Sequence, residues 1–84
     1  MALYLIDKQY GENGLVLAAK DPDAKVVLIQ DGVYLRPTDV KEVYSVAEDV
    51  NKRGLAESLP SSIKQIGYDE LIDLIVDNKV INFC

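Results

Sequence analysis

The side chains of this 84-residue chain that could perform covalent chemistry are few, and its single cysteine, Cys84, is the first to consider. One cysteine cannot form an internal disulfide or a four-cysteine metal site. The chain contains no histidine, which removes the usual general base, Ser-His-Asp and Cys-His nucleophile systems and most transition-metal sites. Cys84 is the last residue, and an adjacent α-carboxylate disfavours the thiolate that a reactive cysteine needs. We therefore expect an ordinary thiol and no cofactor.

Carboxylates stand where two apolar runs of the sequence stop. Asp31, beside Gly32, follows the first run and could be a general base or a helix cap. Because the sequence offers no partner acid or histidine for it, a cap or turn role is favoured. Glu48 and Asp49 follow the second run, in the first turn of a predicted helix, where acids complement the helix dipole. Tyr34, on a loop after a strand, is the aromatic most suited to an interface. These five residues are our candidate interface residues.

A glycine-containing segment, 11–14, follows the first predicted strand, where nucleotide-binding folds place a phosphate loop. Neither the GxGxxG nor the GxxxxGK[ST] spacing is present, and a glutamate within the segment would repel a phosphate. We therefore predict that this segment is a loop or the start of a helix and binds no phosphate.

The periodicity of apolar residues predicts alternating strands and helices. Strands are predicted at 2–6, 25–30, 43–46, 63–66 and, at an edge, 80–83; helices at 15–20, 47–53 and 69–78, with a turn or two around 33–36. The second and third strands are apolar on both faces, so we expect them to be adjacent and central. The pattern predicts an α/β fold, a three-layer α/β/α sandwich with a mostly parallel sheet of four or five strands.

Composition and charge limit the range of functions. Eighty-four residues, 49% of them hydrophobic, make one domain over 1–84, marginal alone and helped by association. The net charge of −5 opposes direct binding of nucleic acid or anionic membranes. No apolar run approaches the length of a membrane span, and the first residues lack the basic region of a signal peptide. We expect a cytoplasmic protein.

Three segments together resemble the DsrH/TusB-type proteins of bacterial and archaeal sulfur relay. The first, 26–33, is a strand that ends in a Gln-Asp-Gly-Val turn. The second, 43–55, is a strand that continues into an acidic helix ending in Arg-Gly-Leu. The third, 66–71, is an isoleucine followed shortly by a tyrosine and an acidic-apolar helix. The similarity spans most of 25–83. It implies an α/β/α fold and a cytoplasmic complex with subunits of the DsrE/TusD and DsrF/TusC types. The output of such a relay is 2-thiouridine in tRNA or, in sulfur oxidisers, sulfur trafficking.

The resemblance also bears on which residue would carry sulfur. In these complexes the essential persulfide cysteine belongs to the DsrE/TusD-type subunit. Some DsrH-type chains have a cysteine of their own near the first helix, but residues 11–15, the corresponding region of this chain, contain none. We therefore expect a non-catalytic subunit or interaction module, in a heteromer or by self-association. Two alternatives remain open: a sulfurtransferase that carries persulfide on Cys84, and a small-ligand-binding α/β module unrelated to sulfur.

Overall fold

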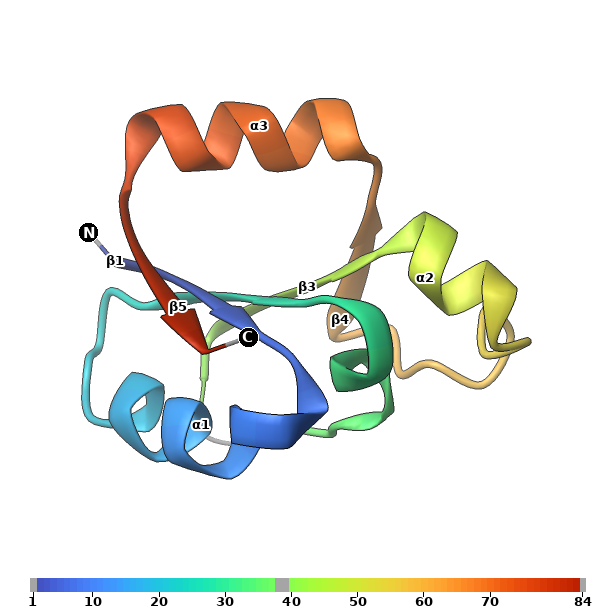
Figure 1. The fold of residues 1–84 in the computed structure, drawn as a ribbon, viewed down its shortest axis with the longest axis horizontal. Helices are drawn as coiled ribbons and strands as arrows, with labels where there is room; N and C mark the ends of the chain where they lie inside the picture. Colours follow the sequence, from blue (N-terminus) through green and yellow to red (C-terminus); the bar gives the residue numbers. More distant parts are fainter. Residues whose placement is uncertain (1, 38–39, 84) are drawn as a thin grey trace.

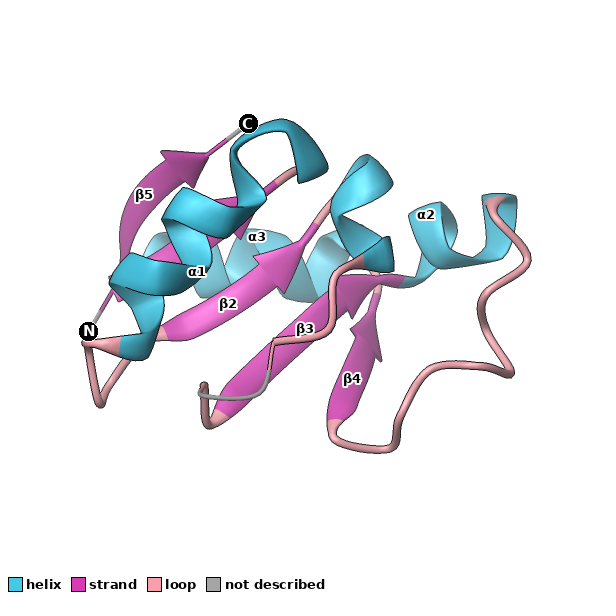
Figure 2. Cartoon of the chain, turned by 90° about the horizontal axis from the view of Figure 1, so that it is seen from below, coloured by secondary structure: helices cyan, strands magenta, loops and turns pink. Residues whose placement is uncertain are grey.

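Five parallel strands form a single sheet in the computed structural model, which describes residues 2–37 and 40–83. The strand order is β4-β3-β2-β1-β5, with every pair parallel. Figure 2 shows the strands side by side. Their bounds are β1 Ala2–Ile6, β2 Lys25–Leu28, β3 Glu42–Val46, β4 Ile63–Ile66 and β5 Lys79–Phe83. The predicted parallel α/β fold is confirmed, with β2 and β3 adjacent and inside the sheet and β5 at an edge.

Helices lie on both faces of the sheet. They are η1 Lys8–Tyr10, α1 Gly11–Ala19, η2 Gln30–Tyr34, α2 Ala47–Lys52 and α3 Tyr68–Asp77. α1 covers one face and α3 crosses the other (Figure 1), because β4 and β5, which α3 connects, lie at opposite edges. The predicted three-layer sandwich is thus confirmed. Within the described ranges, no helix combines the length and the apolar character needed to cross a membrane.

Each face of the sheet has its own apolar core. Successive side chains of a strand point to opposite faces, so Val26 and Leu28 pack on the α1 side while Val27 packs beneath α3. All three are fully buried. This double burial explains why β2 is apolar at consecutive positions.

Several element boundaries differ from the prediction, and the largest differences are at α1, β2 and η2. α1 begins at Gly11 rather than at residue 15, directly after η1, and a Cβ at Gly11 would collide with the Leu35 side chain. β2 ends at Leu28 rather than at residue 30, since Gln30 has a φ of 49° and turns the chain into η2. The short helix therefore starts three residues earlier than the expected 33–36. The glycine of α1 serves close packing, which periodicity alone does not reveal.

Candidate functional site

The candidate site is the edge of the sheet at which β1, β2 and β3 end. The chain passes there from β1 into η1, from β2 into η2 and from β3 into α2 (Figures 1 and 2). In parallel α/β sheets, ligands and partners meet this carboxyl edge. The five candidate residues lie on η2 and α2, which contact each other, so the structure brings the two groups together.

Asp49 is a buried carboxylate that joins α2 to η2. It is only 6% exposed, and its Oδ2 accepts a hydrogen bond of 2.9 Å from the backbone N–H of Gln30. Gln30 has a positive φ of 49°, a backbone conformation that is unfavourable for residues other than glycine. Asp49 thus does more than complement the dipole of its own helix, since it also holds the strained start of η2.

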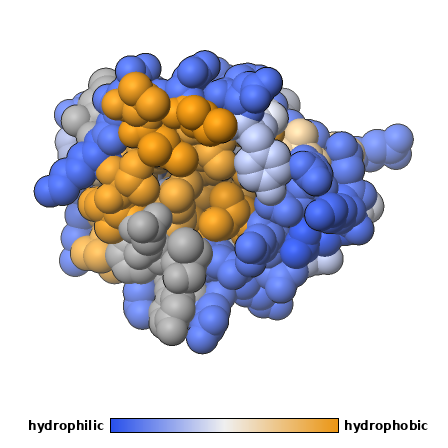
Figure 3. All heavy atoms as spheres, turned by 45° about the horizontal axis from the view of Figure 1, so that its top comes forward, coloured by the Kyte–Doolittle hydropathy of each residue, from blue (hydrophilic) through white to orange (hydrophobic). Residues whose placement is uncertain are grey.

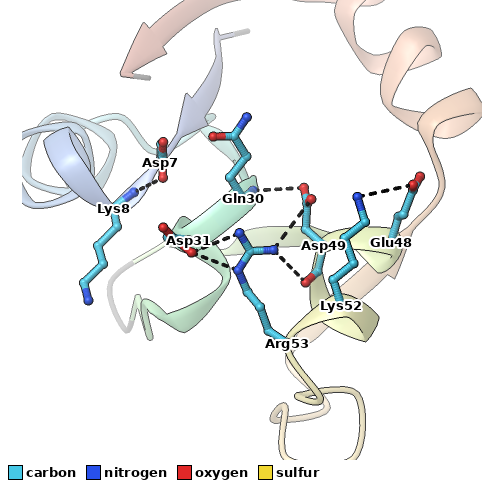
Figure 4. A network of polar contacts seen from close by, with 8 residues as sticks. All are labelled: Asp7, Lys8, Gln30, Asp31, Glu48, Asp49, Lys52 and Arg53. Atoms are coloured by element: carbon cyan, nitrogen blue, oxygen red, sulfur yellow. Dashed lines mark hydrogen bonds and ion pairs between the residues drawn. The ribbon is translucent and has the colours of Figure 1, made fainter.

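Arg53, just after α2, bridges the carboxylates of both segments. Its Nε and Nη2 each lie 2.9 Å from Oδ1 of Asp31. Its Nη1 lies 3.8 Å from Oδ1 of Asp49 and donates a 3.1 Å hydrogen bond to the Asp49 carbonyl oxygen. Figure 4 shows the guanidinium between the two acids. The sequence favours a cap or turn role for Asp31. It lies in the turn of η2 that follows β2, but η2 has no side-chain cap bond, and the Asp31 carboxylate is bound by Arg53.

Gly32 lets η2 approach the end of β1. It is buried, and a Cβ at this position would collide with the carbonyl oxygen of Ile6 and crowd Cα of Asp7. The next residue, Val33, is fully buried in the core on the α1 side. The Gln-Asp-Gly-Val turn therefore has a structural task at each of its four positions.

Three of the candidate residues present their side chains to solvent. They are Asp31, Tyr34 and Glu48. The ring of Tyr34 lies beneath the ammonium of Lys8, whose Nζ is 5.9 Å from the ring centroid, so η1 and η2 also meet here. Glu48 is in a surface ion pair with Lys52, one helical turn later, at 3.8 Å. These exposed groups remain candidates for contact with a partner, while Gly32 and Asp49 shape the edge from within.

The chemistry available at this edge is limited. Among the described residues, no group of histidine, cysteine, aspartate or glutamate side chains is arranged to hold a metal ion. The buried carboxylate of Asp49 is already engaged by a backbone N–H and by Arg53. Cys84, the potential persulfide carrier, lies outside the described residues. The arrangement is a surface on which Asp31, Asp49 and Arg53 are engaged with one another.

A hollow suited to a small ligand lies elsewhere, beside α1. Its volume is about 420 Å³, and it is lined by Leu15, Val16, Ala19, Lys20, Arg36, Pro37 and Val40. None of these residues belongs to the network of Asp31, Asp49 and Arg53. The small-ligand alternative therefore has a cavity of suitable size but no link to the motifs of the carboxyl edge.

Gln30 and Arg53 stand in the motifs that carry the resemblance, but they are not among the candidate site residues. Arg53 stands four residues after Asp49, a spacing at which opposite charges pair on a helix, so this contact could have been found. The pairing of Arg53 with Asp31, 22 residues away, has no comparable local signal. The backbone of Gln30 donates the critical bond, so its side-chain type gives no indication of that role.

The chain is similar to one known family and to a solved structure. A family model described as "DsrH like protein" matches residues 12–81. The match begins before residue 25, so α1 belongs to the shared region too. The solution NMR structure of protein Tm0979 from Thermotoga maritima is 30% identical, with a TM-score of 0.66, over 92% of this chain and 93% of that one. No curated protein matches the chain.

Proposed function

The chain belongs to the family of DsrH-like proteins, and from this premise we propose that it is a non-catalytic subunit of a sulfur-relay complex. Its task there is to supply a rigid surface that completes the assembly. The partners are subunits of the DsrE/TusD and DsrF/TusC types, which the family context implies. The complex acts in the cytoplasm, in tRNA thiolation or in sulfur oxidation.

The observation that carries this proposal is the internal engagement of the motif residues. Two of the three segments that carry the resemblance, 26–33 and 43–55, contact each other through the Asp31–Arg53–Asp49 network and the hydrogen bond to Gln30. A catalytic motif would be expected to leave a reactive group facing a cleft. Here the side chains stabilise the loops instead, which supports a scaffold role.

The charge of the chain supports protein partners over nucleic acid. With a net charge of −5, the surface opposes approach of phosphate backbones, so any tRNA would be bound by another subunit. Exposed Tyr34 at the carboxyl edge is a residue type enriched at protein interfaces, and the acids Asp31 and Glu48 near it are suited to the polar rim of such an interface.

The experiment is reconstitution of the complex from purified subunits. The DsrE-like and DsrF-like proteins of the same genome are mixed with this chain or with its Cys84→Ser variant, and assembly is followed by light scattering. Sulfur transfer is followed with a persulfide donor. We expect both forms to complete the complex and to support equal transfer. Failure of the unchanged chain to bind either subunit would refute the proposal.

The persulfide alternative has its own measurement. Alkylation of Cys84 is followed against pH, and the chain is weighed by mass spectrometry after exposure to a persulfide donor. A non-catalytic subunit is expected to show a thiol pKa near the ordinary value of about 8.5 and to gain no stable sulfur atom. A much lower pKa, with a persulfide on Cys84 that passes to an acceptor, would establish the sulfurtransferase instead.

A further inference from the structure

α3 carries an apolar stripe that faces solvent, in addition to the side that packs on the sheet. Leu71 and Leu74 pack into the core beneath the helix. Four other apolar residues remain exposed: Tyr68 at 49%, Ile72 at 57%, Ile75 at 38% and Val76 at 77%. Their spacing of four, seven and eight residues from Tyr68 places them along one side of the helix. We call these four residues the outer stripe.

The sheet beneath α3 adds to this apolar surface. α3 is the helix that crosses this face, and Leu5, Ile29 and Val80 of the same face are only partly buried. Figure 3 shows an apolar patch on the side of the molecule that carries α3, with hydrophilic groups along much of its border. A contiguous exposed patch of this kind marks an interaction surface more often than scattered apolar residues do.

The charged residues of α3 itself are all negative. α3 contains Asp69, Glu70, Asp73 and Asp77 and no basic residue. Asp69 and Asp73 each stand three residues before a member of the outer stripe, Ile72 and Val76, and so border it on the helix surface. Within the described part of the chain, none of these four carboxylates takes part in an ion pair. The stripe is an apolar surface with an unneutralised acidic rim.

We propose that the outer stripe of α3 is the docking surface for a different subunit, whose matching surface is apolar with a rim of lysine and arginine. Such a rim would neutralise Asp69 and Asp73 while the apolar centres exclude water. A second copy docked through the same stripe would set the acids of both copies around one interface, and like charges there oppose association. The choice of a protein partner rests on the proposed function; the choice of surface rests on α3.

Binding of the full chain to the purified DsrE-like and DsrF-like subunits of the same genome tests this surface. The variant Ile72→Ser/Val76→Ser is expected to weaken binding by about tenfold or more, which is about 1.4 kcal/mol. Val16→Ser is the matched control, because Val16 is 56% exposed on α1, on the opposite face of the sheet. It is expected to leave affinity unchanged. Urea unfolding verifies that each variant stays folded.

A second pair of variants tests the acidic rim. Asp73→Lys is expected to weaken binding and to make it less sensitive to salt, since it repels a basic partner surface. Asp23→Lys, at an exposed turn, makes the same charge change away from α3 and should alter neither property.

The outcomes distinguish failure of the docking surface from failure of the proposed function. If the α3 variants and their controls weaken binding equally, or if neither weakens it, the docking surface is overturned and the proposed function still stands. Absence of binding by the unchanged chain would overturn both. A dimer of the chain alone that Ile72→Ser/Val76→Ser dissociates would assign the stripe to a second copy and also overturn this inference.

Discussion

Removal of the Asp49 carboxylate should destabilise the fold far more than removal of its exposed neighbour. In Asp49→Ala, the Gln30 N–H loses its acceptor at 2.9 Å, and Nη1 of Arg53 loses a carboxylate at 3.8 Å. A buried donor left without a partner costs about 1–3 kcal/mol, and a partly exposed ion pair adds about 0–1 kcal/mol. Because the Gln30 site is only partly buried, we expect a total of about 2 kcal/mol.

Glu48→Ala is the matched control. Glu48 occupies the same helical turn, but its ion pair with Lys52 is on the surface, where such pairs contribute about 0–1 kcal/mol. Asp49→Asn keeps one acceptor oxygen without the charge, so its free energy of unfolding should lie between those of the two alanine variants. Equilibrium unfolding in urea gives the free energies, and the slope verifies that the unfolded state is unchanged. For a domain of this size, 2 kcal/mol corresponds to a decrease in Tm of about 10 °C.

Hydrogen exchange identifies the location of the effect. The Gln30 amide should exchange faster in Asp49→Ala than in the unchanged chain, because its acceptor is gone. Equal stabilities of Asp49→Ala and Glu48→Ala, together with unaltered exchange at Gln30, would refute the assignment of Asp49 as the link between α2 and η2.

Two further predictions concern packing and pH. Gly32→Ala should cost about 3 kcal/mol in free energy of unfolding, because its Cβ would collide with the Ile6 carbonyl oxygen. Gly67→Ala meets no atom within 4 Å and should cost about 1 kcal/mol or less in the same urea assay, since Gly67 is the N-cap of α3, where alanine is less favourable than glycine. Burial, with a smaller contribution from the hydrogen bond and charge of Glu42, raises the pKa of Tyr44 above its ordinary value of 10.0. Folding therefore favours the protonated phenol, and this stabilisation is complete below pH 10 and is lost as the pH rises through the raised pKa. Tyr44→Phe should lose less stability than the unchanged chain over that alkaline range, and identical slopes of stability against pH would contradict the assignment.

The local pattern of the sequence was sufficient to predict the layers of the fold. Consecutive buried valines in β2 predict a strand covered on both faces, and the length and periodicity of α3 predict a helix over the sheet. The acids that open α2 and the glycine that follows Arg53 likewise indicate where that helix begins and ends. These features depend on neighbours within a few residues, so they are visible in the sequence.

The tertiary structure alone decided what the edge residues contact. Asp31 pairs with Arg53 because η2 and the end of α2 meet in space, and Gly32 is required because η2 presses on β1. The outer stripe of α3 has the same cause: the sequence shows a wide apolar face, but the crossing from β4 to β5 determines that Leu71 is buried and Ile72 exposed. Contacts between segments far apart in the chain depend on how the elements pack, and no local periodicity encodes that arrangement.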